Sequence, residues 1–366
     1  MSAARLAATA AALFVLGRCS PAAGQERWTF GPFARLDSAG PCLAPSPSLR
    51  FTCPIRKATV AWASKDVFNP AAVVRGNKVY LLYRAQDSLG TPAGTSRIGI
   101  AWSSDGLKFA QNPTPVLYPD NDAMKEYEWE GGCEDPRIVR SRSGTYVMTY
   151  TAYDGRTARL AVATSEDLFH WKKEGLAFGE ALGGKYRDAW SKSGSIVAEV
   201  RGEDIVAASI RGRFWMYWGE GSVHIAVSED LVRWIPVEDA KGEPVVVLAP
   251  RHRAFDSFLV EPGPPALVQG EGIVFVYNGS NNRAGGDPSL PPGAYAAGQA
   301  LFAGDDPARL IDRTPATFFR PEYPAELAGQ VNNVCFLEGL VPFRGRWLLY
   351  YGEADSRIGV AASAHP

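Results

Sequence analysis

Residues 129–140 read WEGGCEDPRIVR, and residues 259–268 read LVEPGPPALV. Both stretches place an acidic residue, Asp135 or Glu261, directly before a proline at the start of an apolar run. Proline is tolerated at the first residue of a strand, so each stretch is typical of a strand that begins beside a carboxylate. The two stretches therefore predict a repeated β unit with an acidic side chain at its entrance.

Similar units recur along the chain. Each begins with an apolar strand, passes through a turn that carries glycine, and returns in a second apolar strand rich in Tyr and Trp. The units cover residues 68–87, 134–154, 191–220, 261–280 and 331–355, and the third of them holds an extra strand-length insertion. A third strand follows in most units, and the period-2 alternation of apolar residues favours strands over helices.

The spacing of the units predicts the fold class. Their starts lie roughly 60–70 residues apart, which is enough for about four strands with their turns. We therefore predict an all-β protein, a five-bladed β-propeller with four-stranded antiparallel blades around a central axis. Residues 25–65 precede the first complete unit and are expected to supply the missing outer strand, so that residues 25–366 form one catalytic domain.

Equivalent positions in the units predict where the functional side chains gather. In a propeller, the first residues of each innermost strand face one mouth of the channel. Alignment of the strand starts brings together Asn69, Asp135, Lys192 with Ser193, Glu261 and Asn333. Alignment of the turns after the second strands brings together Gln86, Tyr153, Glu220, Ser280 and Glu353. The ring thus offers Asp135, Glu220 and Glu261 from three adjacent blades.

Three convergent carboxylates indicate cleavage of a glycosidic bond. Hydrolysis of a glycoside needs one protonated carboxyl group and one ionised carboxylate, and inverting enzymes hold the two far enough apart to admit a water. Close like charges push pKa values apart, which helps one group stay protonated. A lone acidic residue more often faces solvent or caps a strand. Because Asp135, Glu220 and Glu261 repeat at equivalent places, we interpret them as catalytic candidates.

Polar and aromatic residues near these carboxylates are expected to bind the sugar. The flat ring of a tryptophan can stack on a pyranose, although core packing is an equally common role for such a ring. The substrate-binding candidates are Asn69, Arg84, Arg97, Tyr153, Lys192, Trp218, Asn333 and Asp355. Trp129, Trp190 and Trp215 are further stacking candidates.

The N-terminus has the pattern of a secretory signal peptide over residues 1–24. Arg5 supplies the positive region, LAATAAALFVLG the apolar region, and SPAAG the small residues for cleavage before Gln25. We therefore expect an exported protein, periplasmic or extracellular. Cys19 lies where a lipid could be attached, but Arg18 occupies a place that usually holds a small residue, so a lipoprotein anchor is not favoured.

Composition argues against several partner classes. The net charge of −1 over 366 residues gives no electrostatic reason to expect nucleic acid or an anionic membrane surface. No later segment is long and apolar enough for a spanning helix. None of the four His is paired with Cys or His at ligand spacing, so no metal or other cofactor is expected. The oligomeric state is left open.

The cysteines of an exported chain can pair. Cys42 and Cys53 lie in the Pro- and Ser-rich segment GPCLAPSPSLRFTCP and are candidates for a disulfide bond that would hold this segment. Cys133 and Cys335 lie inside strand-like runs, where a small buried hydrophobic residue is the more common interpretation.

The chain resembles glycoside hydrolase family 130, the β-mannoside phosphorylases and β-mannosidases. The resemblance covers nearly all of the mature chain and rests on GGCEDPRIV, EPGPPAL, TAYDGRTARLAVATSEDL and the GEAD ending. It implies a five-bladed propeller and a mannose-containing oligosaccharide as substrate. It also implies that Asp135 is the proton donor, acting through a hydroxyl of the bound mannose. Asn69, Arg84 and Asp355, together with Lys192, match positions that hold the terminal mannose.

The resemblance also bears on the reaction type. Phosphorylases of the family keep a basic cluster for phosphate, including a His-Arg pair on the second strand of the third blade. Here that strand reads FWMYWGE and lacks the pair. Glu220 and Glu261 instead match the acidic pair of the hydrolytic branch, whose members act on β-1,2-linked mannosides. A carboxylate at this place would repel phosphate and could activate water.

The sequence therefore predicts an exported, inverting, exo-acting β-mannosidase. Asp135 would be the acid, and either Glu220 or Glu261 would activate water. The alternatives are a β-mannoside phosphorylase that releases mannose 1-phosphate and a non-catalytic glycan-binding propeller, since a fold alone does not fix a function.

Overall fold

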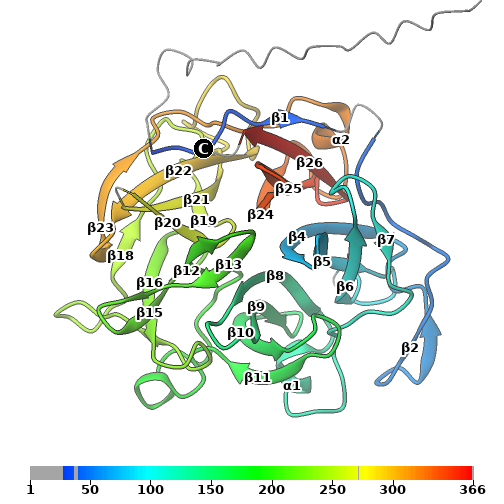
Figure 1. Ribbon diagram of the computed structural model, residues 1–366. Coiled ribbons are helices and arrows are strands. Elements are labelled where there is room, and N and C mark those ends of the chain that lie inside the picture. The colour runs from blue at the N-terminus through cyan, green and yellow to red at the C-terminus, as the bar shows by residue number, and fades with distance from the viewer. Residues whose placement is uncertain (1–27, 37–39, 92, 271, 365–366) are drawn as a thin grey trace, which may run out of the picture.

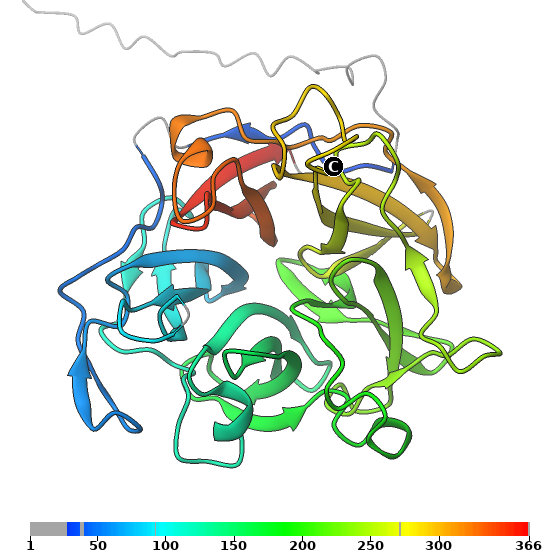
Figure 2. The same ribbon diagram turned by 180° about the vertical axis from the view of Figure 1, so that it is seen from behind.

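The computed structural model describes residues 28–36, 40–91, 93–270 and 272–364. The expected signal peptide and Cys19 lie outside these residues. The protein is nearly all-β, and its strands form antiparallel sheets that follow one another along the chain. Figure 1 shows these sheets set side by side around a common centre, and Figure 2 shows the same ring from behind.

The first two sheets have a simple up-and-down order. The first contains β4 (Asp66–Arg75), β5 (Lys78–Gln86), β6 (Ser96–Ser103) and β7 (Ala110–Gln111). The second contains β8 (Gly132–Arg140), β9 (Tyr146–Tyr153), β10 (Ala158–Ser165) and β11 (Lys172–Leu176). In each sheet the first strand is buried along almost its whole length, and it lies nearest the centre of the ring (Figure 1).

The next two sheets carry irregularities. The third contains β12 (Gly194–Arg201), β15 (Arg213–Trp218) and β16 (Val223–Ser228), with β17 (Ile235–Pro236) and β18 (Val246–Leu248) both paired to β16. Its expected insertion forms β13 (Asp204–Ala207) and β14 (Ser209–Ile210). The fourth contains β19 (Leu259–Pro262) and β20 (Ala266–Gln269), which both pair with β21 (Gly272–Ser280), then β22 (Tyr295–Ala303) and β23 (Asp306–Arg313).

The last sheet joins the two ends of the described chain. It contains β24 (Cys335–Phe343), β25 (Arg346–Glu353) and β26 (Arg357–Ala364), and its fourth strand is β1 (Ala34–Arg35). β1 pairs antiparallel with β26, with Ala34 opposite Ala362. The prediction that the segment before residue 66 supplies an outer strand is confirmed by this pairing, which closes the ring by hydrogen bonds between distant parts of the chain.

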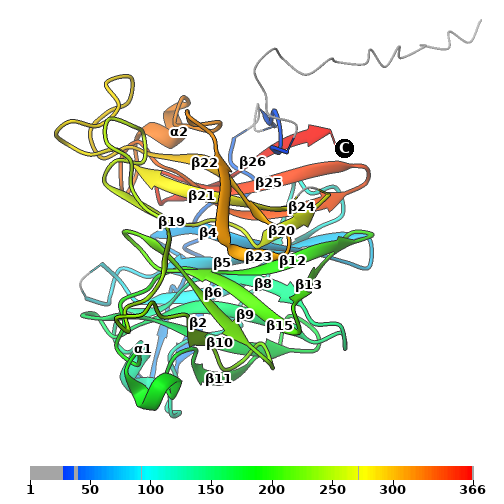
Figure 3. The ribbon, with the colours of Figure 1, turned by 90° about the vertical axis from the view of Figure 1, so that its left-hand side faces the viewer.

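The remaining elements lie outside the sheets. They are the hairpin of β2 (Phe51–Cys53) and β3 (Ala58–Val60), the helices α1 (Lys125–Glu128) and α2 (Pro324–Leu327), and the 3₁₀ turn η1 (Ala181–Gly184). Figure 3 shows that α1, α2 and the loop between β21 and β22 project toward the same side of the ring. No helix among the described residues is long and apolar enough to cross a membrane.

The core lies between neighbouring sheets. The large aromatic residues Trp62, Trp234 and Trp347 are buried there. Short parallel contacts also join one sheet to the next, such as Val197 opposite Ala266 between β12 and β20. Because each inner strand is packed on both faces, the start of each strand is held in a fixed place relative to its neighbours.

The expected disulfide is not formed. Within the described ranges no bond joins Cys42 to Cys53, and Cys53, Cys133 and Cys335 are thiols. The backbone N–H of Cys42 donates to the carbonyl of Ile358 on β26, whereas Cys53 pairs with Ala58 inside the β2–β3 hairpin. The two cysteines are therefore attached to different parts of the fold, and sequence spacing alone could not reveal this separation.

Candidate active site

β-Bulges at the starts of the inner strands aim side chains at the centre of the ring. The register between β4 and β5 skips Asn69, and the register between β8 and β9 shifts between Glu134 and Arg137. Asn69 and Asp135 have φ values of 47° and 48° in the left-handed region, which Asn and Asp enter more readily than most residues. Bulges of this kind redirect a side chain next to an active site.

The register of β24 corrects the fifth member of this alignment. Leu337 lies opposite Tyr351 and Gly339 lies opposite Tyr350, so the skipped residue is Glu338. Glu338, and not Asn333, therefore occupies the place that corresponds to Asn69 and Asp135. Sequence comparison chose Asn333 because it precedes an apolar run. The acidic residue before Gly339 was the better signal, because it repeats the pattern of an acid before proline or glycine.

Asn69 and Asp135 line one pocket with a volume of about 210 Å³, whereas Glu338 is not part of its lining. The other walls come from β5, β19, β22 and β24 and from the segments next to β12, β15 and β25. The lining residues are Asn69, Arg84, Asp135, Lys192, Glu220, Glu261, Tyr295, Val331, Val334, Phe336 and Asp355. The structure thus brings together the three predicted catalytic carboxylates and four of the predicted substrate-binding residues.

Asp135 is held by donors from the neighbouring sheet. Asn69 donates its Nδ2 to Asp135 Oδ1 at 2.9 Å, and Arg84 Nη1 approaches the same oxygen at 3.3 Å. Burial alone would raise the pKa of the Asp135 carboxyl, but Arg84, Lys192 and the hydrogen bond from Asn69 outweigh it and lower that pKa below its usual range. In the free protein Asp135 is therefore a carboxylate.

Glu134 shares the same arginine. Arg84 Nη2 lies 2.6 Å from Glu134 Oε1, and the Ser96 hydroxyl donates to that oxygen at 3.0 Å. Burial, together with the charge of Asp135, raises the pKa of the Glu134 carboxyl despite this pairing. Arg84 is thus engaged by two acidic side chains, which leaves it little capacity for a free anion.

Glu220 and Glu261 face each other across the other side of the pocket. Burial and the charge of Glu220 raise the pKa of the Glu261 carboxyl to about 8. The Ser193 hydroxyl donates to Glu261 Oε2 at 3.2 Å, and the indole N–H of Trp190 donates to Glu220 Oε2. With a pKa of about 8, the Glu261 carboxyl keeps its proton near neutral pH.

The remaining titratable groups balance these charges. Burial raises the pKa of Asp355 to about 7, and the charge of Asp135 adds to this effect. Burial opposes the charge of Lys192, but the surrounding carboxylates, first among them Glu134, raise the Lys192 pKa above its usual value. Burial also raises the pKa of Tyr295, so its hydroxyl is a donor at all ordinary pH values.

Four predicted substrate-binding residues lie outside this pocket. Arg97 is buried and pairs with Asp87 at 2.7 Å, which is a structural role. Trp218 is buried and packs against Phe178, with ring centroids 4.7 Å apart. Tyr153 ends β9 half-buried. Asn333 is also half-buried, and its backbone carbonyl accepts the N–H of Tyr295 at 2.9 Å.

The structure also adds residues to the site that are not among the predicted catalytic or substrate-binding candidates. Tyr295 follows the Gly- and Pro-rich loop of residues 286–293, and this loop was the only available signal for it. Arg137 lies beneath the pocket and joins three sheets. Its guanidinium donates to the carbonyls of Pro262 at 2.7 Å, Gly263 at 2.7 Å and Asp135 at 3.1 Å. Arg137 therefore fixes the backbone beside both Asp135 and Glu261.

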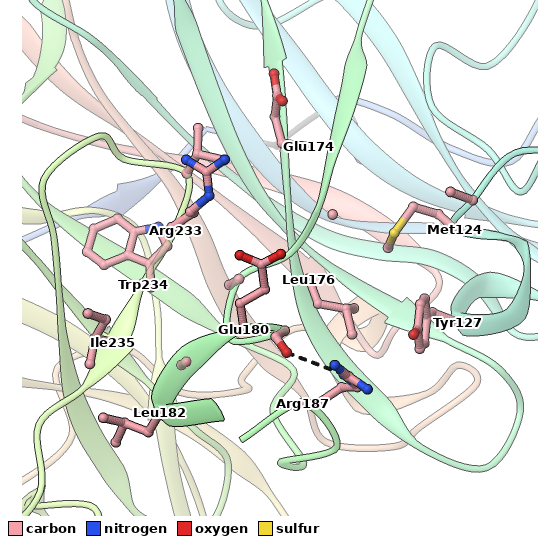
Figure 4. A pocket seen from close by; sticks show the side chains of 16 residues that line it. Met124, Tyr127, Glu174, Leu176, Glu180, Leu182, Arg187, Arg233, Trp234 and Ile235 are labelled. Atoms are coloured by element: carbon pink, nitrogen blue, oxygen red, sulfur yellow. Dashed lines mark hydrogen bonds between the residues drawn. The ribbon is translucent and has the colours of Figure 1, made fainter. Parts of the chain in front are cut away.

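A larger cavity lies elsewhere, between β11, η1 and β17. It has a volume of about 680 Å³, and Figure 4 shows the side chains that line it. Two of its charged groups have partners nearby: Arg187 donates to the carbonyl of Gly179, and Glu174 accepts from Thr164 and Lys172. Because this cavity holds none of the convergent carboxylates, we assign the active site to the smaller pocket. Across the described residues, no cluster of His, Cys, Asp and Glu suits a metal ion.

Comparisons with known proteins agree with this geometry. The family model of glycoside hydrolase family 130, described as beta-1,4-mannooligosaccharide phosphorylase, matches residues 46–365. A 1,2-beta-oligomannan phosphorylase from Thermoanaerobacter sp. (strain X514) is 30% identical over 313 residues, which are 83% of this chain and 92% of that protein.

Two solved structures are more similar still. A glycosyl hydrolase from Bacteroides ovatus has a TM-score of 0.90 and 46% identity, covering 92% of this chain and 95% of that one. Another has the same TM-score and identity and covers 93% of this chain and 98% of that one. It is described with the words "The GH130 family of mannoside phosphorylases contains glycoside hydrolases that target beta-1,2 mannosidic linkages in Candida mannan". Phosphorylases and hydrolases thus both occur among the similar proteins.

Proposed function

This chain belongs to glycoside hydrolase family 130, and we propose that it is an exported, inverting exo-β-mannosidase that hydrolyses β-1,2-linked manno-oligosaccharides. We also propose that its sheets are the five blades of a propeller, since each inner strand borders the central pocket. The active site at the axis then draws one or more side chains from every blade.

The charge balance of the pocket carries the proposal of hydrolysis. Four lining residues are acidic, namely Asp135, Glu220, Glu261 and Asp355, and two are basic, namely Arg84 and Lys192. Arg84 is already paired with Glu134 and Asp135. Lys192 is likewise surrounded by carboxylates, first among them Glu134. Neither cation of the pocket is therefore available to a phosphate dianion, even though Glu261 and Asp355 carry protons near neutral pH, whereas a neutral sugar and a water need no such cation.

The size of the pocket favours exo-action. Its volume of about 210 Å³ is below the roughly 300–1,000 Å³ of sites that enclose drug-sized ligands. It therefore accommodates a single terminal sugar ring, and the rest of an oligosaccharide must project from it. Asn69, Arg84 and Asp355 offer hydrogen-bond donors and acceptors for the hydroxyl groups of that ring.

The carboxyl groups supply the two proton transfers of an inverting reaction. A water gives a proton to the Glu220–Glu261 pair while its oxygen bonds to the anomeric carbon. The bond from that carbon to the leaving sugar breaks, and the leaving oxygen gains a proton that starts on Asp135 and passes through a mannose hydroxyl. Asp135 is ionised in the free protein, so it takes up this proton when substrate binds; Asp355, protonated up to about pH 7, is a nearby source.

One experiment separates this function from the alternatives. β-1,2-Mannobiose is incubated with the protein, with and without inorganic phosphate, and the products are followed by ¹H NMR. We expect α-mannose to appear first and at the same rate in both samples. Phosphate-dependent formation of α-mannose 1-phosphate would instead establish a phosphorylase, which the name of the Thermoanaerobacter relative makes the second candidate. Saturable binding without any product would establish a glycan-binding protein.

Export is a separate proposal that rests on residues 1–24 alone. Expression of the full chain in a bacterial host, followed by fractionation and N-terminal sequencing, should give a mature protein that begins at Gln25 outside the cytoplasm. A mature N-terminus at Cys19 carrying lipid would instead establish an anchored protein.

A further inference from the structure

The segment before β12 contacts both members of the acidic pair. Trp190 donates its indole N–H to Glu220 Oε2, and the Ser193 hydroxyl donates to Glu261 Oε2 at 3.2 Å. Lys192, between them in sequence, lines the pocket itself. This short segment therefore controls the environment of the pair that the proposed mechanism uses to activate water.

The indole ring of Trp190 is held at the rim and not in the core. Its exposed fraction is 46%, whereas Trp234 and Trp347 are buried. A ring with so much surface in water gains little from packing, so burial does not explain its place. Its polar contact with Glu220 connects it directly to the pocket wall.

We propose that Trp190 is a positioning residue that holds Glu220 in the ionised form and thereby makes Glu220 the base. An indole N–H can only donate a hydrogen bond, so it favours an acceptor-only carboxylate over a carboxyl group that carries a proton. Glu261, whose pKa burial raises to about 8, keeps its proton near neutral pH. This inference rests on the proposed hydrolysis, because it assigns one role within that reaction.

The other groups around Glu220 are consistent with this assignment. Lys192 contributes a positive charge that favours ionised Glu220, and Tyr295 on β22 faces both members of the pair. Glu261 on β19 is the neighbour that opposes ionisation of Glu220, and it is the more deeply buried of the two. Burial penalises the charged form, so the proton is better placed on Glu261 than on Glu220.

The kinetic test replaces Trp190 by phenylalanine, which keeps an aromatic ring but removes the donor. We expect Trp190→Phe to lower kcat roughly tenfold with little change in KM, since a hydrogen bond to a charged group is lost without loss of the sugar site. The acid limb of the kcat/KM profile should move up by about one pH unit, because Glu220 then binds a proton more readily.

Trp171→Phe is the matched control. Trp171 also donates its indole N–H, to the carbonyl of Leu168 at 2.7 Å, but it lies in the turn before β11 and away from the pocket. This variant makes the same chemical change and should leave the pH profile unchanged. An unchanged profile in Trp190→Phe as well would overturn the inference.

Azide rescue tests the role of Glu220 directly. Azide needs no base, so it should restore turnover of Glu220→Ala and give α-mannosyl azide, while Glu261→Ala should gain much less. Preferential rescue of Glu261→Ala would make Glu261 the base and overturn the assignment.

A measurement made without substrate separates failure of this inference from failure of the proposed function. The fluorescence of exposed Trp190 should change on acidification as Glu220 is protonated, and this step should vanish in both Trp190→Phe and Glu220→Gln. If no manno-oligosaccharide is hydrolysed, the proposed function fails, but the fluorescence step still decides the Trp190–Glu220 contact. A step that persists in Glu220→Gln would refute the contact itself.

Discussion

Replacement of Arg137 by methionine should strongly destabilise the protein. The Arg137 side chain is 1% exposed and donates to the carbonyls of Asp135, Pro262 and Gly263. It also lies 3.4 Å from a carboxylate oxygen of Glu338 on a third sheet. No other residue in the described structure is seen to join the inner strands β8, β19 and β24 through hydrogen bonds and an ion pair at a single side chain.

The expected magnitude follows from these contacts. Each of the three buried carbonyls that loses its donor costs about 1–3 kcal/mol, and Glu338 adds little because burial favours its neutral form. Partial relaxation makes these effects less than additive, so we expect Arg137→Met to lower the free energy of unfolding by about 4 kcal/mol. This is a large part of the roughly 5–15 kcal/mol that stabilises a typical native protein.

Glu338 provides the comparison variant. Neither of its carboxylate oxygens accepts a hydrogen bond among the described residues, and burial raises its pKa well above the usual value. Glutamine resembles the neutral acid that this environment favours, so Glu338→Gln should cost less than about 1 kcal/mol. The double variant Arg137→Met, Glu338→Leu should be more stable than Arg137→Met alone, because no buried carboxyl group is then left without a polar partner.

Urea unfolding at pH 7, followed by tryptophan fluorescence, measures these differences through the midpoint and the slope. Arg137→Met should also lower kcat, since the backbone beside Asp135 and Glu261 loses its common support. A change in unfolding free energy below about 1 kcal/mol would refute the view that Arg137 ties the site together. Equal destabilisation by Glu338→Gln would show that the ion pair, and not the carbonyl contacts, supplies the stability.

Three further predictions concern the pocket carboxyl groups. Asp135→Asn should reduce hydrolysis of β-1,2-mannobiose by roughly 10²–10⁴-fold. Hydrolysis of a nitrophenyl β-mannoside should fall much less, because that leaving group needs no proton. Equal losses with the two substrates would argue against an acid role for Asp135. Glu261→Gln should raise the stability at pH 9 relative to the wild type. The Glu261 pKa is about 8 in the folded protein and 4.5 as its ordinary value, so its contribution to stability is full below pH 4.5 and is lost as pH rises through 8. The loss has a ceiling of roughly 5 kcal/mol, and thermal unfolding at pH 5 and 9 measures it. The kcat/KM of the wild type should fall as pH rises above about 7, where Asp355 loses its proton, and Asp355→Asn should abolish this limb; a limb that persists in Asp355→Asn would assign it to Glu261.

The sequence predicted the main features of the fold because they depend on local pattern. Alternation of apolar residues and the repeated turns predicted the strands, and the need for a final outer strand correctly directed attention to the segment before residue 66. The disulfide prediction failed for the opposite reason. The places of Cys42 and Cys53 depend on which distant strands they adjoin, and nothing in an eleven-residue spacing expresses that.

The site was predicted where residue type and position were both informative. Asp135, Glu220 and Glu261 are acidic at equivalent positions, and the structure brings them into one pocket. Glu338 was missed because a bulge shifts the register by one residue, and a bulge leaves no distinct mark in a list of apolar residues. Arg97 was included because an arginine that pairs with Asp87 in the interior looks, in sequence, like one that faces a sugar.

Membership of the family does not decide between phosphorolysis and hydrolysis. That choice depends on a small number of charged side chains in the pocket. The chain is 30% identical to a protein named as a phosphorylase and 46% identical to one named as a glycosyl hydrolase, and the same kind of fold can serve both reactions. What differs physically is the group that must stand opposite the bond to be broken: a phosphate needs cations there, and a water needs a base. In this pocket Glu220 and Glu261 occupy that side, and Lys192, a cation of the pocket lining, is surrounded by carboxylates. Keeping two acids close together costs free energy, which the packing of the rigid inner strands offsets. The close pair provides a proton acceptor strong enough to activate water near neutral pH.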